Sequence, residues 1–269
     1  MGARVRAVFA FALFVAHAQT IQVNFSPQDV IEKRLRAYTT KNPTREPAMK
    51  ALFEEAGCKD DSLSEQKVRG TKSPNLICTS KGNTGSTIVV GAHFDLIEKG
   101  QGVVDNWSGS SLLPSFYQGL TDSARKHTFL LIAFAGEEQG LLGSQSFVKQ
   151  LGDQRSLVKA MVNLDTLGLG ATKVWLSHSD RNLANWLARV AKQMNIPLGA
   201  VDVEKVGTTD SEPFRERQIP AITVHSVTQQ TLGVLHSPQD TIVAIQMDSY
   251  YQTYKLVISY LVALDQVLD

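Results

Sequence analysis

The sequence has little of several features that would place it in a class at once. Its 269 residues include only two cysteines, and 27 Lys and Arg against 26 Asp and Glu leave a formal net charge of +1. This near balance argues against a nucleic-acid-binding protein and against a polybasic membrane surface. Beyond the N-terminal region no apolar run approaches the roughly 18 residues that a spanning helix needs. We therefore expect neither nucleic acid nor a membrane as a partner.

The N-terminus has the pattern of a secretory signal peptide. Two arginines precede an apolar run over residues 7–16, and Ala16-His17-Ala18 is a small-x-small cleavage site. We expect residues 1–18 to be removed and residues 19–269 to form a single domain of a secreted or periplasmic protein. An uncleaved anchor is the alternative, although a run of about ten residues is short for a membrane span.

The two cysteines, Cys58 and Cys78, fit an oxidising compartment and one disulfide. Such a bond would close a loop of about 20 residues and would stabilise the fold by on the order of 3 kcal/mol. Two free, buried thiols are the alternative. Neither cysteine lies near the acidic motifs described below, so we do not expect them to bind a metal.

From residue 86 onward, apolar runs typical of buried strands alternate with helical patterns. The expected strands span residues 86–92, 129–135, 157–164, 173–177, 201–206 (an edge strand) and 219–224. This alternation predicts a three-layer α/β/α sandwich around a mixed, mostly parallel sheet.

The N-terminal part is less regular. A helix starts at Pro27, then Pro43 and Pro47 are expected to break the chain before a second helix. A strand over residues 75–80 is followed by a hairpin-like turn. Further along, Pro114 predicts a kink or local distortion in a helical run.

Acidic and histidine side chains follow the expected strands. His93, Glu138 and Asp165 come directly after buried strands, whereas Asp105 and His236 lie in loops. Ligands of open α/β sheets bind at the carboxyl ends of the strands, so all five side chains could meet there. Imidazole and carboxylate are ordinary zinc ligands, and cations would offset the repulsion between three close carboxylates. An Asp between two histidine-containing sets could bridge two ions.

Each of these residues also has a structural explanation. Asp105 could cap a helix, Asp165 could belong to a turn, His93 could be a core histidine and His236 a surface one. Glu137 and Glu138 could lie in a solvated loop at a helix start. The remaining histidines have no acidic partner in the sequence pattern and are interpreted as structural; they are His17, His127, His178 and His225.

The order and separation of the motifs are more specific than any one of them. The motifs are His93-x-Asp95, Asp105-Asn106-x-Ser108-Gly109, Gly136-Glu137-Glu138-x-Gly140-Leu141-x-Gly143-Ser144, Asn163-Leu164-Asp165 and His236-Ser237-Pro238-x-Asp240. This set resembles the secreted two-zinc aminopeptidases, the leucine-aminopeptidase-like metallopeptidases, whose relatives include glutaminyl cyclase and glutamate-carboxypeptidase-like proteins. The resemblance covers about residues 86–240 and the terminal helix, and it implies the zinc-exopeptidase, phosphorylase/hydrolase-like form of the sandwich.

The resemblance implies two zinc ions. One would be held by His93, Asp105 and Asp165, and the other by Asp105, Glu138 and His236. The same resemblance implies peptide hydrolysis through a metal-bridging water.

The resemblance also assigns roles beside the ions. Glu137 would be the general base, and Asp95 would orient His93 from behind. Asp210 would support the site in the same way, although Ser211 beside it departs from the family pattern. Trp107 and Val104 are bulkier than the residues often found there, which leaves the shape of the pocket open.

Other functions remain compatible with the residues. Glutaminyl-peptide cyclotransferase shares a Gly-Glu-Glu strand end, a carboxypeptidase or dipeptidase could use the same ions, and a receptor or binding module could keep the fold without the chemistry. The sequence favours an aminopeptidase that acts on peptides. We expect a monomer, because no region looks like an added dimerisation domain.

Overall fold

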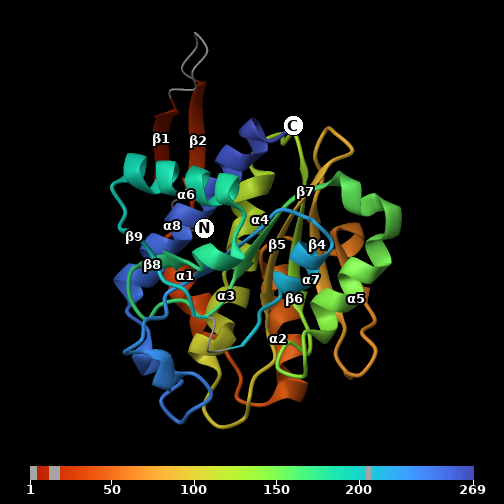
Figure 1. Cartoon of the computed structure of the whole chain (residues 1–269), viewed down its shortest axis with the longest axis vertical. Coiled ribbons are helices and arrows are strands. Elements are labelled where there is room, and N and C mark those ends of the chain that lie inside the picture. Colours follow the sequence, from red (N-terminus) through yellow and green to blue (C-terminus); the bar gives the residue numbers. More distant parts are fainter. Residues whose placement is uncertain (1–4, 12–18, 204–206) are drawn as a thin grey trace.

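The computed structural model describes residues 5–11, 19–203 and 207–269, and at its centre is an eight-stranded sheet with helices on both sides (Figure 1). The strands are β3 (Leu63–Gln66), β4 (Asn75–Ser80), β5 (Thr87–His93), β6 (Thr128–Phe134), β7 (Val158–Leu164), β8 (Thr172–Val174), β9 (Leu198–Ala200) and β10 (Ala221–His225). The predicted α/β/α class with a mixed sheet is confirmed.

The order of strands in the sheet is β3-β4-β6-β5-β7-β10-β8-β9. Strands β6, β5, β7 and β10 run parallel to one another, while β3, β4 and β8 each pair antiparallel with a neighbour. The three neighbours β6, β5 and β7 therefore end at the same edge, and this is the edge at which His93, the glutamates and Asp165 emerge.

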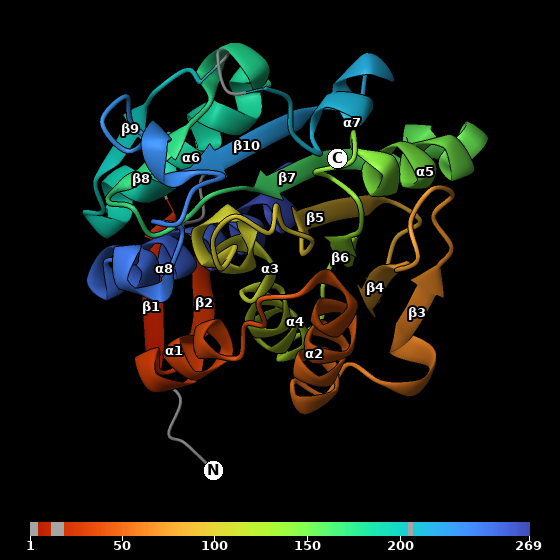
Figure 2. The same cartoon turned by 90° about the horizontal axis from the view of Figure 1, so that it is seen from below.

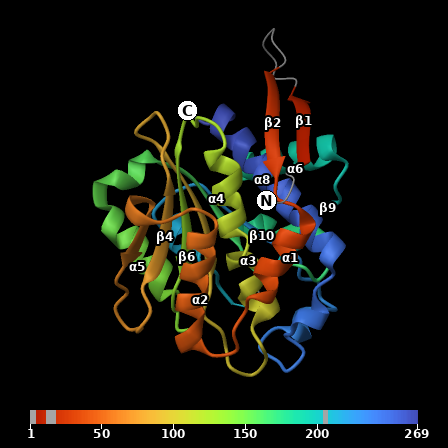
Figure 3. The ribbon, with the colours of Figure 1, turned by 180° about the vertical axis from the view of Figure 1, so that it is seen from behind.

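The helices cover both faces of the sheet (Figures 2 and 3). They are α1 (Gln28–Arg36), α2 (Asn42–Glu55), α3 (Ser108–Ser110), α4 (Leu113–Thr121), α5 (Leu142–Leu151), α6 (Arg181–Met194), α7 (Glu212–Glu216) and α8 (Met247–Val267). Helices α5 and α7 pack on one face, whereas α2, α4 and α8 pack on the other.

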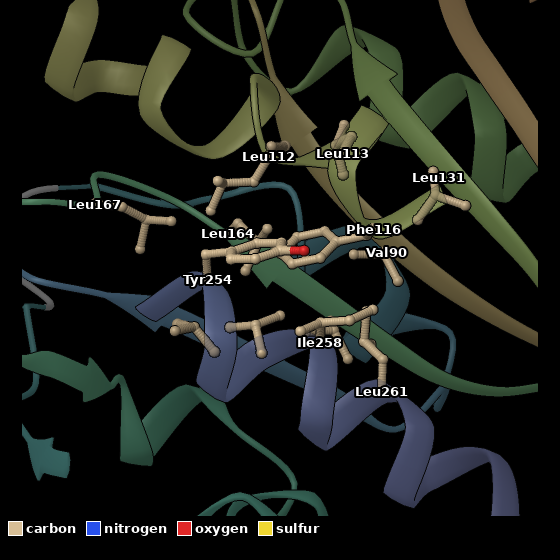
Figure 4. Close-up of a cluster of buried hydrophobic side chains, with 14 of the residues drawn as sticks. Val90, Leu112, Leu113, Phe116, Leu131, Leu164, Leu167, Tyr254, Ile258 and Leu261 are labelled. Atoms are coloured by element: carbon tan, nitrogen blue, oxygen red, sulfur yellow. The ribbon is translucent and has the colours of Figure 1, made fainter. Parts of the chain in front are cut away.

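Alternate residues of the central strands are buried on opposite faces. Ile88 and Val90 of β5 belong to the larger core with α4 and α8, while Val89 belongs to the smaller core beneath α5. Figure 4 shows the larger core, where Phe116 of α4 stacks on Tyr254 of α8 at 5.7 Å between ring centroids. Because side chains alternate along a strand, burial on both faces explains the nearly continuous apolar runs of the sequence.

Several local expectations were wrong. Pro47 does not break the chain: α2 begins at Asn42 and continues through it. Pro43 lies in the first turn of α2, where the missing backbone donor is tolerated, whereas Pro47 lies inside the helix and removes one of its hydrogen bonds. The turn over residues 81–85 does not form a hairpin, because β6 lies between β4 and β5.

The expected strand over residues 201–206 was also misplaced. The strand β9 lies at Leu198–Ala200, residues 201–203 have no strand, and residues 204–206 lie outside the described part of the chain. Pro114 does mark a distortion: it lies in the first turn of α4, and the helical run is interrupted between Ser110 and Leu113.

Cys58 and Cys78 form the predicted disulfide, which links the segment after α2 to β4. At the N-terminus β1 (Val5–Phe11) pairs antiparallel with β2 (Gln19–Phe25). The expected cleavage site at Ala16-His17-Ala18 lies outside the described residues, so the signal peptide stays a prediction. No helix in the described ranges combines the length and apolar character that crossing a bilayer requires.

Candidate active site

The carboxyl ends of three parallel strands bring the site together. His93 is the last residue of β5, the glutamates Glu137 and Glu138 lie in the turn after β6, and Asp165 directly follows β7. Asp105 comes from the turn Val103–Trp107, where its own backbone is not helical (φ −116°, ψ 93°). His236 arrives from the loop before α8, with its backbone in the left-handed region at φ 53°. These residues, far apart in the sequence, meet at one edge of the sheet.

The five predicted ligand residues form two sets that share Asp105. His93 Nε2 lies 3.3 Å from Asp105 Oδ1 and 3.7 Å from Asp165 Oδ1. His236 Nε2 lies 3.1 Å from Asp105 Oδ2 and 3.2 Å from Glu138 Oε2. Within each set one candidate atom of every residue lies within 4.8 Å of the others. The two oxygens of Asp105 thus face the two histidines separately.

Glu137 lies beside both sets. Together with His93 and Glu138 it forms a third group of atoms within 4.8 Å, but these two partners already belong to the sets that share Asp105. Asp95 fixes the turn that carries both glutamates, since its carboxylate accepts hydrogen bonds from the backbone N–H of Glu137 at 3.1 Å and of Glu138 at 3.2 Å. Its nearest contact with His93, Oδ1 to Nδ1, is 3.7 Å, which is longer than a hydrogen bond.

The protein groups perturb one another strongly. Burial raises the pKa of Glu137 well above its usual value. The negative charges of Asp210, Asp165 and Asp105 raise this pKa further, whereas His93 lowers it. Burial likewise raises the pKa of Glu138. Hydrogen bonds to Asp105 and Glu138 raise the pKa of His236 to about 10. Several carboxylates close together raise one another's pKa and also raise the pKa of a neighbouring imidazole. The site therefore concentrates negative charge, as functional sites often do.

A pocket of about 80 Å³ opens on this cluster. Apart from the residues of the cluster, it is lined by Thr166, Trp175, Val203, Gly207, Thr208, Thr209, Thr223, His225, Val227 and Leu235. The pocket therefore has apolar and hydroxyl-bearing walls beside a strongly polar floor, an arrangement typical of binding sites for small molecules and chain ends.

The other histidines of the described residues have structural partners, as expected from the sequence. His127 bonds Ser86 through Nδ1 and the carbonyl of Leu268 through Nε2. His225 lines the pocket, but its Nε2 donates to the Val201 carbonyl and its Nδ1 accepts from the Val227 N–H. Burial lowers the pKa of His225 to about 4, so the ring is neutral. His178 stacks on Trp175 and, contrary to the expectation, has an acidic neighbour: its Nδ1 lies 3.3 Å from Glu212 Oε2. His17 lies outside the described residues.

Two supporting contacts were not predicted. Thr209 donates its hydroxyl to Asp165 Oδ2 at 2.6 Å and accepts from Asn163 Nδ2 at 2.6 Å, which orients the Asp165 carboxylate. Asp240 accepts hydrogen bonds from the N–H of Val104 at 2.7 Å and of Asp105 at 3.3 Å. Asp240 was part of a quoted motif and Thr209 adjoins Asp210, so position in the motifs was the available signal.

Asp210 is fully buried near the cluster, and this gives a pH-dependent prediction. Burial raises its pKa to about 7, while His93 and the Ser144 hydroxyl act in the opposite direction. Between the ordinary carboxyl pKa and about 7 the folded chain keeps a proton that the unfolded chain releases, so this residue lowers stability as pH rises through that range. In chelator-treated protein, Asp210→Asn should therefore raise the melting temperature over wild type more at about pH 8 than at about pH 4. An equal rise in melting temperature at both pH values would contradict the raised pKa of Asp210.

The fold and site define a class: an α/β protein with a cluster of carboxylates and imidazoles at the end of its parallel strands. Residues 75–261 match peptidase family M28, and the chain belongs to this family. The resemblance drawn from the motifs is thereby confirmed.

Relatives and solved structures agree with this assignment. A probable leucine aminopeptidase of Arthroderma benhamiae is 27% identical over 201 residues, which cover 70% of this chain and 56% of the relative. The chain thus spans about half the length of the curated relatives it matches. The zinc aminopeptidase BSAP of Bacillus subtilis superposes with a TM-score of 0.64 at 25% identity, covering 70% of this chain and 49% of that one.

Two further structures show the same fold at lower identity. The LapA aminopeptidase of Legionella pneumophila has a TM-score of 0.78 at 24% identity, with 90% of this chain and 73% of that chain covered. A glutaminyl cyclase of an Acidobacteriales bacterium has a TM-score of 0.70 at 17% identity, with 89% and 93% covered.

Proposed function

We propose that this chain is a secreted, zinc-dependent aminopeptidase that removes N-terminal residues from peptides. The observation that supports it best is the pair of ligand sets that share Asp105, with the carboxylate of Glu137 beside them and outside both sets. Membership of peptidase family M28 and the aminopeptidase and zinc aminopeptidase names of its relatives support the same activity.

The residues present fit divalent cations. Three carboxylates and two imidazoles supply the oxygen and nitrogen donors that zinc prefers. Glu138 Oε1 is buried and has no hydrogen-bond partner among the described residues. A buried carboxylate oxygen without a partner is costly, and a cation would remove that cost. We propose that His93, Asp105 and Asp165 hold one zinc ion and that Asp105, Glu138 and His236 hold the second.

Bound zinc would act as a Lewis acid on the scissile carbonyl and on the attacking water. The chain's own residues would do the rest. Glu137 would accept a proton from that water and donate it to the leaving amine, a role suited to a carboxyl whose pKa is raised by burial. Asp95 would keep the Glu137 carboxylate in place through the turn it holds, and Thr209 would orient Asp165.

A panel of aminoacyl-anilides, assayed with and without a chelator, tests the proposal. We expect hydrolysis that stops with the chelator and returns when zinc is added, and no release of residues from the carboxyl end of peptides. Hydrolysis only from the carboxyl end, or only of dipeptides, would replace the aminopeptidase with a carboxypeptidase or a dipeptidase. Zinc content below one ion per chain would favour a binding module on this fold.

Glutaminyl-peptide cyclisation is the second candidate, favoured by one observation. The glutaminyl cyclase of the Acidobacteriales bacterium shares this fold over 89% of the chain, with a TM-score of 0.70. Cyclisation of a peptide with N-terminal Gln, measured beside anilide hydrolysis on the same preparation, separates the two activities. Secretion, the leader over residues 1–18 and a monomeric state belong to the proposal, and N-terminal sequencing of secreted protein and sedimentation would test them.

A further inference from the structure

A buried arginine outside the motifs contacts the loop that leads into the site. Arg45 lies in the first turns of α2 and is fully buried. Its guanidinium donates to four carbonyl oxygens: Nε to Thr39 at 2.9 Å, Nη1 to Phe94 at 2.9 Å, and Nη2 to Gln101 and Gly102, both at 2.7 Å. These acceptors come from three separate segments, so one side chain joins them.

The acceptors flank two of the proposed zinc ligands. Phe94 directly follows His93, and Gly102 precedes Asp105 by three residues. Arg45 thus holds both ends of the loop between β5 and the Asp105 turn. Its guanidinium also lies 5.4 Å from the ring centroid of Trp107, which belongs to the same turn. A planar fork with five donors suits such an arrangement, whereas a lysine ammonium does not.

The backbone of the loop is shaped around this side chain. Gly102 has φ +60°, and a Cβ there would lie 2.7 Å from Arg45 Nη2 and 2.6 Å from Leu96 Cβ. On the other side of the loop, the Asp240 carbonyl accepts from the N–H of Gln101 at 2.7 Å. The loop is therefore clamped between Arg45 and Asp240, and Asp240 also binds the N–H of Asp105.

The arginine keeps its charge in this position. Burial lowers the pKa of Arg45 to about 10, and the charges of Asp240, Asp95 and Asp105 oppose the shift, so the group is protonated at neutral pH. All four of its hydrogen bonds are consequently charge-assisted, which makes them stronger than bonds between neutral groups.

We propose that Arg45 is a positioning residue for the metal centre, which sets the distance between His93 and Asp105 by fixing both ends of the loop that joins them. This inference rests on the proposed zinc-binding function. Preorganised ligands bind a metal more tightly because no loop has to be ordered on binding, so losing the clamp should weaken zinc affinity rather than alter the chemistry directly.

The test compares Arg45→Lys with Arg125→Lys. Arg125 is also buried and, among the described residues, donates to the carbonyl oxygens of Leu120 and Gly119, but it lies before β6 at the opposite edge of the sheet. Lysine keeps the positive charge, so the electrostatic effect on a cation is unchanged and only the forked contacts are lost. Each variant is measured for zinc affinity by chelator competition, for thermal stability, and for amide hydrogen exchange of residues 94–105 in chelator-treated protein.

We expect both variants to lose thermal stability, and only Arg45→Lys to bind zinc about 10- to 100-fold more weakly, as is typical when an outer partner of a metal ligand is removed. The amides of Gln101, Val104 and Asp105 should exchange faster in that variant alone. Wild-type zinc affinity and wild-type exchange in a folded Arg45→Lys protein would overturn the inference. If that variant does not fold, Gly102→Ala, which pushes on the guanidinium, is measured in its place.

The outcome also separates this inference from the proposed function. A wild-type chain that takes up no zinc would overturn the proposed function. The exchange measurement on chelator-treated protein would still decide whether Arg45 holds the loop.

Discussion

Replacing Glu137 with glutamine is expected to reduce kcat by about 10²- to 10⁴-fold, the usual contribution of a general acid–base group. Glutamine has nearly the same shape but cannot accept and return a proton. Glu137 lies outside the two sets that share Asp105, so zinc content should stay as in wild type. Steady-state kinetics on an aminoacyl-anilide and elemental analysis of the same preparation give the two numbers.

The matched control for this variant is Glu216→Gln. Glu216 is exposed at the end of α7, near the start of β10 and away from the site, and its replacement should leave both values unchanged. A Glu137→Gln protein with near-normal turnover would remove the general-base assignment. Loss of zinc together with activity would instead indicate that Glu137 is a ligand, as the third group of close atoms allows.

Asp105→Asn should have the largest effect on metal content. The two carboxylate oxygens of Asp105 face different histidines, at 3.3 Å and 3.1 Å, so one substitution removes a ligand from both sets. We expect the variant to retain neither zinc ion after dialysis and to lose activity. The affinity loss should exceed the roughly 10- to 100-fold that follows from removing an outer partner of a ligand.

Two further variants give this prediction its internal control. Asp165→Asn affects only the set with His93, and His236→Gln affects only the set with Glu138. Each should cost one ion of the two. Retention of two ions by Asp105→Asn, or loss of both by either single-set variant, would contradict a bridging role for Asp105.

The sequence predicted the components of the site from the ends of expected strands for His93, Glu138 and Asp165, and from the order of the motifs and the family resemblance for Asp105 and His236. Glu137 and Glu138 come after an apolar run that reads as a buried strand, and parallel strands end at a common edge. The disulfide was predicted from the two cysteines, but two free thiols remained the alternative until the structure showed the bond. These inferences depend on local order in the chain and on general rules of α/β topology.

The supporting contacts could not be predicted in the same way. Arg45 lies between Pro43 and Pro47, which predicted a break in the chain rather than a helix. Its partners are backbone carbonyls, which the residue types do not identify. Asp240 was visible as part of a motif, but its bonds to Val104 and Asp105 span more than 130 residues. Almost every residue carries a backbone N–H and C=O, so the residue types do not show which of these groups a distant side chain will bind.

The sequence by itself determined the class of fold, the family and the residues that meet at the site, because hydrophobic periodicity and motif spacing are properties of the chain. Only the tertiary structure decided the strand order, with β6 between β4 and β5, and the clamp formed by Arg45 and Asp240. The reason is physical: pairing between strands and charge-assisted bonds to buried carbonyls depend on which segments are neighbours in space, and packing of the whole chain sets that neighbourhood.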